Sequence, residues 1–126
     1  MTISLFIPCF VDLMYPQVGI SMVRIFEKLG HQVVVPKAPA CCGQPAFNAG
    51  HRKAAARVAR TFTRAFSRDL PVVTPSGSCA AMLVHRLPEL LGVEPYDVWE
   101  LSAFLDAQGI ELPLRNEGRT VAYHDS

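Results

Sequence analysis

Ser4-Leu5-Phe6-Ile7-Pro8-Cys9 is the stretch that points most directly to the fold, because it is a short apolar run that stops at a proline and a cysteine. Runs of this length and composition are typical of buried strands. Two similar runs follow along the chain, Gln32-Val33-Val34-Val35, which is stopped by Pro36, and Pro71-Val72-Val73-Thr74. The three runs predict three strands that are buried in one sheet.

Between these runs the apolar residues recur every three or four positions, which predicts helices. Gly30 follows the first helix as a C-cap, and Asn48 is the expected N-cap of the longest one. The alternation of strands and helices predicts an α/β fold with three layers, in which helices cover a mostly parallel, Rossmann-like sheet. The expected helices include residues 16–29, 48–66 and 99–108. A further helix is expected to follow a turn at residues 76–78 and to run through Met82 to Leu91, with Cys79 near its N-terminus. Residues 121–123 are expected to begin a further strand.

Length and composition favour one soluble domain in a reducing compartment. The chain has 126 residues, of which 50% are hydrophobic, and this suffices for one core. No apolar run approaches the ~20 residues that span a bilayer. The N-terminus has no basic segment before its apolar run, so a signal peptide is not expected. We therefore expect a cytoplasmic protein, in which cysteines serve a metal or catalysis before they form disulfides.

The four cysteines, Cys9, Cys41, Cys42 and Cys79, are the candidate site residues. Each follows a predicted strand, and the carboxyl ends of parallel strands meet at one edge of a sheet. Four thiolates suit either a tetrahedral zinc ion or an iron–sulfur cluster. The C-x2-C pairs typical of zinc sites are absent, which favours a cluster, while structural zinc and buried free thiols remain as alternatives. Gly43 is expected to let the backbone turn beside the cysteine doublet.

Charge is distributed unevenly although the net charge is only +1. Every charged residue from 28 to 68 is basic, whereas most of the charged residues from 69 to 126 are acidic. A solvated helix face is the simplest interpretation of the basic residues, and docking to an acidic partner or an anionic membrane surface is the alternative. Nucleic-acid binding is not expected, because no aromatic residues interleave the basic ones. The basic residues on one face of the predicted helix 48–66 and just beyond it are Lys53, Arg57, Arg60, Arg64 and Arg68.

The cysteine pattern resembles a known family. Cys9, Cys41-Cys42-Gly43 and Cys79 resemble the cysteine-rich CCG domain of proteins like the cysteine-rich subunit of heterodisulfide reductase and the glycolate oxidase iron–sulfur subunit. Two longer stretches are similar to the iron–sulfur subunit of bacterial lactate utilisation. They are Cys42-Gly43-Gln44-Pro45-Ala46-Phe47-Asn48 and Pro75-Ser76-Gly77-Ser78-Cys79-Ala80-Ala81-Met82.

This resemblance implies a cofactor, partners and a domain organisation. The four cysteines would bind an iron–sulfur cluster, in the first place a 4Fe–4S cluster, and no catalytic residue is implied. The partners would be other subunits of a complex that oxidises a small 2-hydroxy acid, lactate or glycolate, and this chain would transfer electrons. Residues 1–126 would be a single CCG domain and the N-terminal half of a longer two-domain protein, because the second domain of such proteins begins with a segment like Tyr123-His124-Asp125-Ser126.

One position departs from the family pattern. Met82 stands where the heterodisulfide reductase relative has a further cysteine, and a thioether is a weak ligand for iron. An ordinary 4Fe–4S cluster or a zinc ion therefore fits the residues better than the double cluster of that relative. Heterodisulfide-type redox catalysis and a zinc-stabilised interaction domain are the alternative functions. The isolated chain is expected to lose an iron–sulfur cluster readily in air.

Overall fold

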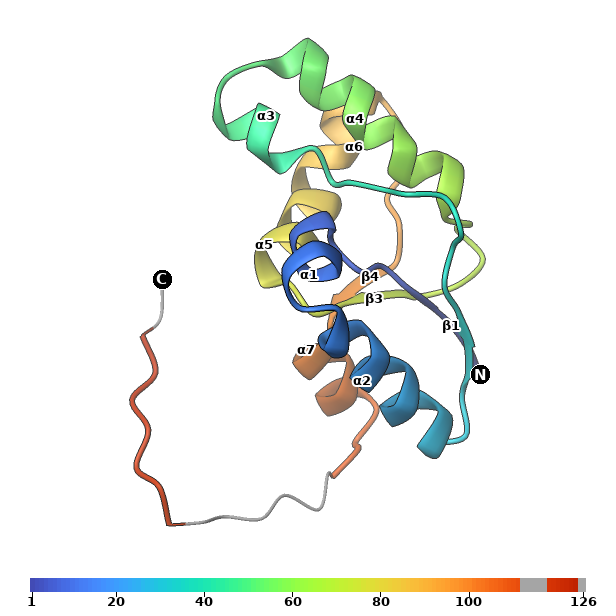
Figure 1. Cartoon of the computed structure of the whole chain (residues 1–126). Coiled ribbons are helices and arrows are strands. Elements are labelled where there is room, and N and C mark those ends of the chain that lie inside the picture. Colours follow the sequence, from blue (N-terminus) through green and yellow to red (C-terminus); the bar gives the residue numbers. More distant parts are fainter. Residues whose placement is uncertain (112–117, 125–126) are drawn as a thin grey trace.

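A computed structural model describes residues 1–111 and 118–124 and shows an α/β fold (Figure 1). In these residues a four-stranded sheet has the order β2-β1-β3-β4, and every pair of neighbouring strands is parallel. The expected three-layer fold with a parallel sheet is therefore confirmed. The strands are β1 (Thr2–Leu5), β2 (Gln32–Val34), β3 (Val72–Thr74) and β4 (Val98–Glu100).

Helices cover both faces of the sheet and enclose two separate apolar cores (Figure 1). Helices α2 (Pro16–Lys28) and α7 (Leu101–Ala107) contribute Met22, Phe26 and Phe104 to the core on one face. On the other face, α4 (Arg52–Ala65) and α6 (Leu87–Leu91) pack against the second core. None of the helices in the described parts of the chain is long and apolar enough to cross a membrane.

The strand order contains a switch point between β1 and β3. The chain runs from β1 to β2 on one side, and then crosses back to β3 on the other side of β1. Connections that diverge in this way leave a crevice at the carboxyl ends of the two central strands, where ligands of such sheets bind. Two short helices begin at this crevice, α1 (Cys9–Met14) after β1 and α5 (Gly77–Ala81) after β3.

The helix expected over residues 48–66 is present as α4, but it begins at Arg52, four residues later than expected. The residues before it form a separate short helix, α3 (Gln44–Asn48). Gly50 separates them with a φ of 81°, a left-handed conformation that no helix can continue through. Asn48 is therefore the last residue of α3 and not an N-cap, and His51 occupies the N-cap position of α4.

The helix expected after the turn at residues 76–78 is present, but it begins within that turn, at Gly77, and consists of three consecutive segments. Ser76 caps α5 by accepting a hydrogen bond from the backbone N–H of Cys79. A π-helical turn over Met82–Arg86 then joins α5 to α6. Pro88 gives a physical reason for this wider turn, because a proline ring clashes with the carbonyl four residues earlier in an ordinary α-helix.

Two expectations near the C-terminus need correction. The helix expected over residues 99–108 is present as α7, but its first two residues belong to β4, and Glu100 caps α7 with its carboxylate. Residues 121–123 form no strand, and Val121 and Tyr123 are 86% and 89% exposed. A strand without a neighbour is not stable in water. Residues 125–126 of the same expected segment lie outside the described residues.

Candidate metal centre

All four cysteines lie at the carboxyl edge of the sheet, beside the switch point. Cys9 is the first residue of α1, which follows β1, and Cys79 lies in α5, which follows β3. Cys41 and Cys42 lie in the loop that connects β2 to α3. Sequence alone predicted this shared edge from the position of each cysteine after a strand.

The four thiols form a row of neighbours. The Sγ atoms of Cys9 and Cys41 are 4.0 Å apart, and those of Cys42 and Cys79 are 3.6 Å apart. Cys41 and Cys42 are adjacent in the chain and so connect the two pairs. Cys9 is exposed and Cys41 is half-buried, whereas the other two are 3% and 6% exposed. The row therefore runs from the surface into the core.

The cysteine doublet is fastened to α4. The backbone N–H of Cys41 donates to the Thr61 hydroxyl over 3.0 Å, and the N–H of Gly43 donates to the Cys41 sulfur over 3.5 Å. Gly43 has a φ of 81°, and a Cβ atom at this residue would lie 2.7 Å from the carbonyl oxygen of Ala55. Only glycine fits here, because both the left-handed backbone and the close approach exclude a side chain.

A second set of contacts positions Cys79. Its N–H donates to the Ser76 hydroxyl over 3.3 Å. The Gln44 side-chain amide, one residue after the doublet's glycine, donates to the carbonyl oxygen of Ser78 over 3.4 Å. This bond joins the start of α3 to the start of α5, so the segments that carry Cys42 and Cys79 are held together.

Cys42 keeps its proton and so favours thiolates at its neighbours. Its single S–H donates to the sulfur of Cys79 over 3.6 Å, which is the main reason that the pKa of Cys79 is lowered to about 7. The protonated thiol of Cys42 next to Cys41 is also the main reason that the pKa of Cys41 is lowered to about 5. The pKa of Cys42 is itself raised, because it holds the shared proton next to Cys41 and Cys79 and is buried. Partial desolvation and the nearby Cys41 raise the pKa of Cys9.

Four cysteine sulfurs form a donor set that suits either an iron–sulfur cluster or a zinc ion. Within the described ranges, no three His, Cys, Asp or Glu side chains are already arranged around one point that could hold a metal ion. The thiols instead form two close pairs. Thr74, at the carboxyl end of β3, has a fully buried hydroxyl without a hydrogen-bond partner in the part of the chain that the structure describes.

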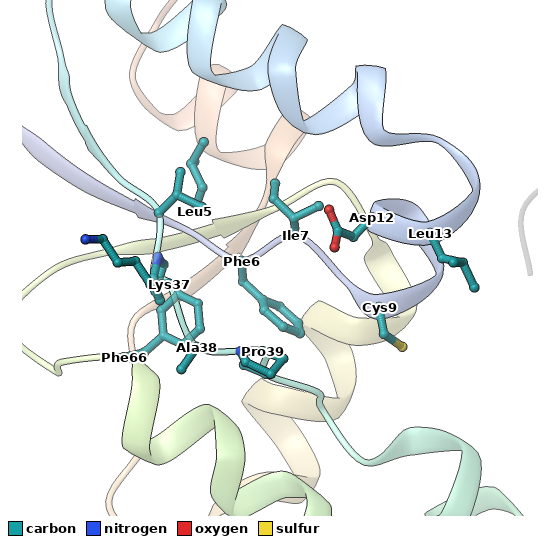
Figure 2. A pocket seen from close by; sticks show the side chains of 13 residues that line it. Leu5, Phe6, Ile7, Cys9, Asp12, Leu13, Lys37, Ala38, Pro39 and Phe66 are labelled. Atoms are coloured by element: carbon teal, nitrogen blue, oxygen red, sulfur yellow. The ribbon is translucent and has the colours of Figure 1, made fainter.

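Two hollows open beside the exposed end of the row. The larger, of about 590 Å³, lies between Cys9 and Asp12 of α1 on one side and Lys37 and Phe66 on the other (Figure 2). The smaller, of about 350 Å³, is lined by Cys9, Cys41 and Arg57 among others. Both hollows leave the Cys9 end of the row accessible to solvent or to a partner.

Sequence reasoning missed two residues that support the site. Ser76 was interpreted as part of a turn, although a serine three residues before Cys79 is a regular N-cap signal that could have identified it. Thr61 lies 20 positions from Cys41 and gives no local signal, so only the tertiary structure brings it to the doublet.

The fold and the thiol row define a cysteine-rich domain, and comparison with protein families agrees. Residues 3–84 match the family described as "CCG: Cysteine-rich domain", and the chain belongs to this family. No solved structure matches the chain.

Individual relatives carry a more specific name. The chain is 44% identical over 103 residues to Lactate utilization protein A of Bacillus pumilus (strain SAFR-032). It is 46% identical over 103 residues to the protein of the same name from Geobacillus kaustophilus (strain HTA426). Each match covers 82% of this chain and 42% of the relative, so the chain spans about two fifths of the length of these relatives.

Proposed function

We propose that the four cysteines are the thiolate ligands of a 4Fe–4S cluster. The observation that carries the proposal is the row of four thiols at the switch point of the sheet, with both ends positioned by the two central strands. Membership of a cysteine-rich family agrees with a metal centre. The ligands would be Cys9, Cys41, Cys42 and Cys79.

The spacing of the cysteines along the chain supports iron–sulfur over zinc. Structural zinc sites typically use C-x2-C pairs, and this chain has none. The distances of 4.0 Å and 3.6 Å within the two pairs do not distinguish the two metals, because two sulfurs of a tetrahedral zinc site lie ~3.8 Å apart. Adjacent cysteines such as Cys41 and Cys42 suit a centre in which different iron atoms take one thiolate each.

The surroundings of the row suit electron transfer. An iron–sulfur cluster takes up and gives up single electrons, and its potential depends on hydrogen bonds to sulfur and on solvent exposure. The N–H of Gly43 supplies one such hydrogen bond to Cys41. Cys42 and Cys79 are shielded from water within the core, whereas Cys9 reaches the surface. The exposed end would bring a redox partner within reach, while the buried end excludes solvent.

We extend the proposal to the whole protein on the basis of its relatives. Proteins named Lactate utilization protein A match most of this chain. The chain would be the first of two domains in an electron-transfer subunit, within a complex that oxidises a small 2-hydroxy acid. Lactate is the first candidate and glycolate the second. The domain would pass electrons between partner subunits without contacting the organic acid itself.

Anaerobic reconstitution with metal analysis tests the proposal directly. The reduced chain is incubated with iron and sulfide, or with zinc, and the bound iron, sulfide and zinc are then measured together with the visible absorbance. We expect iron and sulfide in nearly equal amounts and a broad visible absorbance. Binding of zinc alone would overturn the proposal in favour of a zinc-stabilised interaction domain.

A further inference from the structure

Helix α4 carries a row of four exposed basic side chains, which we call the basic stripe. Its residues follow each other at spacings of four, three and four, so they lie on one face of the helix. With a rise of about 1.5 Å per residue, the stripe is about 16 Å long. All four side chains are exposed. The basic stripe consists of Lys53, Arg57, Arg60 and Arg64.

No internal partner neutralises the basic stripe. Helix α4 contains no acidic residue, and none occurs between residues 28 and 68. On α6, which packs against α4, Glu89 is paired with Arg86 at 3.8 Å. Among the described residues, the members of the stripe have neither an ion pair nor an aromatic ring beneath them, whereas Arg52 and Arg68 lie over aromatic rings. Four like charges at helical spacing oppose folding, so the stripe is not there to stabilise the helix.

The basic stripe lies beside the thiol row. Arg57 lines the 350 Å³ hollow together with Cys9 and Cys41. Thr61, one helical turn further along α4, is bonded to the backbone of Cys41. A molecule that covers the stripe would therefore also cover the exposed end of the thiol row.

We propose that the basic stripe is the docking surface for an acidic redox protein. Charge complementarity identifies the occupant, because a line of unpaired cations recognises a line of carboxylates and steers the encounter of two proteins. The electron-transfer role of the docked protein rests on the function proposed above, whereas the docking itself does not.

Other anionic occupants fit the stripe less well. A helix that lies on a membrane inserts its apolar face, but the apolar face of α4, with Ala55, Ala59 and Phe62, is buried in the core. Single-stranded nucleic acid needs aromatic rings for stacking, and the stripe contains none. An acidic protein surface needs only the exposed charges that are present.

A binding assay with a matched pair of variants tests the proposal. The probe is an acidic [2Fe–2S] ferredoxin labelled with a dye, titrated with the reduced, iron-free chain at low and at high salt while fluorescence anisotropy is recorded. The test variant is Arg57→Glu/Arg60→Glu. The control is Arg24→Glu/Lys28→Glu on α2, where both residues are exposed and the net charge changes equally. Circular dichroism verifies the fold of both variants.

We expect the ferredoxin to bind the unaltered chain and to bind it at least about tenfold more weakly at high salt, since exposed charges are screened. The test variant should lose at least about tenfold in affinity, and the control should change less than about twofold. The affinity of the neutral variant Arg57→Gln/Arg60→Gln should lie between those of the test variant and the unaltered chain. This graded loss distinguishes an effect of charge from misfolding of the test variant.

Three results would overturn the proposal. Equal losses of affinity in both charge-reversed variants would show that net charge alone attracts the ferredoxin. Absence of binding at low salt would show that the stripe is a solvated helix face without a docking role. Tighter binding to phosphatidylserine vesicles or to a DNA duplex, with the same dependence on Arg57 and Arg60, would assign the stripe to a membrane or a nucleic acid. Because the assay uses iron-free protein, a failure of cluster assembly does not alter its outcome.

Discussion

Replacement of Gly43 by alanine isolates the contact that fastens the cysteine doublet to α4. Gly43 and Gly50 have the same φ of 81°, but their surroundings differ. A Cβ atom at Gly43 would lie 2.7 Å from the Ala55 carbonyl oxygen and 3.3 Å from the Cβ atom of Ala59. A Cβ atom at Gly50 would meet nothing within 4 Å. Gly50→Ala is therefore a matched control that carries the backbone strain without the clash.

The expected magnitudes follow from these two differences. A non-glycine residue in the left-handed region costs roughly 1–2 kcal/mol, and this cost applies to both variants. The entropy that alanine removes from the unfolded chain also applies to both and cancels in the comparison. Overpacking against a rigid backbone adds about 1–3 kcal/mol at Gly43 alone. Gly43→Ala should therefore lose about 2 kcal/mol more stability than Gly50→Ala.

Urea unfolding of the reduced, iron-free chain, followed by circular dichroism, measures this difference. With a slope of about 1–3 kcal/mol per molar urea, the midpoint of Gly43→Ala should lie about 1 M below that of Gly50→Ala. Iron uptake should also fall in Gly43→Ala alone, because the hydrogen bond from its N–H to the Cys41 sulfur would be displaced.

Coincident midpoints for the two variants would refute the reasoning. That result would mean that backbone strain is the whole effect, and that the doublet does not press against α4 at Ala55. A changed slope in one variant alone would point to a difference in the unfolded state, and the comparison would then be repeated by thermal unfolding.

Three further predictions concern the thiol row and its surroundings. Cys42→Ser should abolish iron incorporation, while Met82→Leu should retain it. Leucine keeps the buried volume of methionine and loses only a weak thioether ligand. Equal loss of iron in both variants would show that Met82 is a ligand. Thr74→Val should raise the free energy of unfolding of the iron-free chain by about 1 kcal/mol, measured in urea, because it removes a buried hydroxyl that has no partner among the described residues. A lower free energy of unfolding would show that this hydroxyl makes a hydrogen bond. At pH 6, iodoacetamide should label Cys41 faster than Cys9 in the iron-free chain, as read by peptide mass spectrometry. This pH lies above the Cys41 pKa of about 5 and below the raised pKa of Cys9, and faster labelling of Cys9 would contradict the assignment.

The parts of the fold that sequence predicted are those with a strong local pattern. The three β-branched or apolar runs became β1, β2 and β3, and the helix at residues 16–29 appears as Pro16–Lys28. β4 escaped prediction because Trp99 fits an amphipathic helix as well as a strand, and its pairing with Val73 of β3 decides between them. The break at Gly50 escaped because glycine within a helical pattern does not by itself show the sign of φ.

In the candidate site too, sequence predicted what depends on local pattern and missed what depends on tertiary contacts. The common edge of the four cysteines followed from parallel-sheet topology, which depends only on their positions after strands. The pairing of Cys9 with Cys41 and of Cys42 with Cys79 depends on how the doublet loop lies against α4 and α5. That placement is set by contacts such as the Thr61 hydroxyl and the Gln44 amide, which link residues far apart in the sequence.

The distance along the chain between the paired thiols has a consequence for the order of assembly. Cys9 and Cys41 lie 32 positions apart, and Cys42 and Cys79 lie 37 apart. Ligands in a short C-x2-C segment can capture a metal in an unfolded chain, whereas these thiols meet only after parallel strands have paired over long range. The proposed cluster would therefore have to be inserted into a domain that has already folded. A metal centre bound by both pairs would then close two long loops of the chain at once, and would slow the unfolding of the domain.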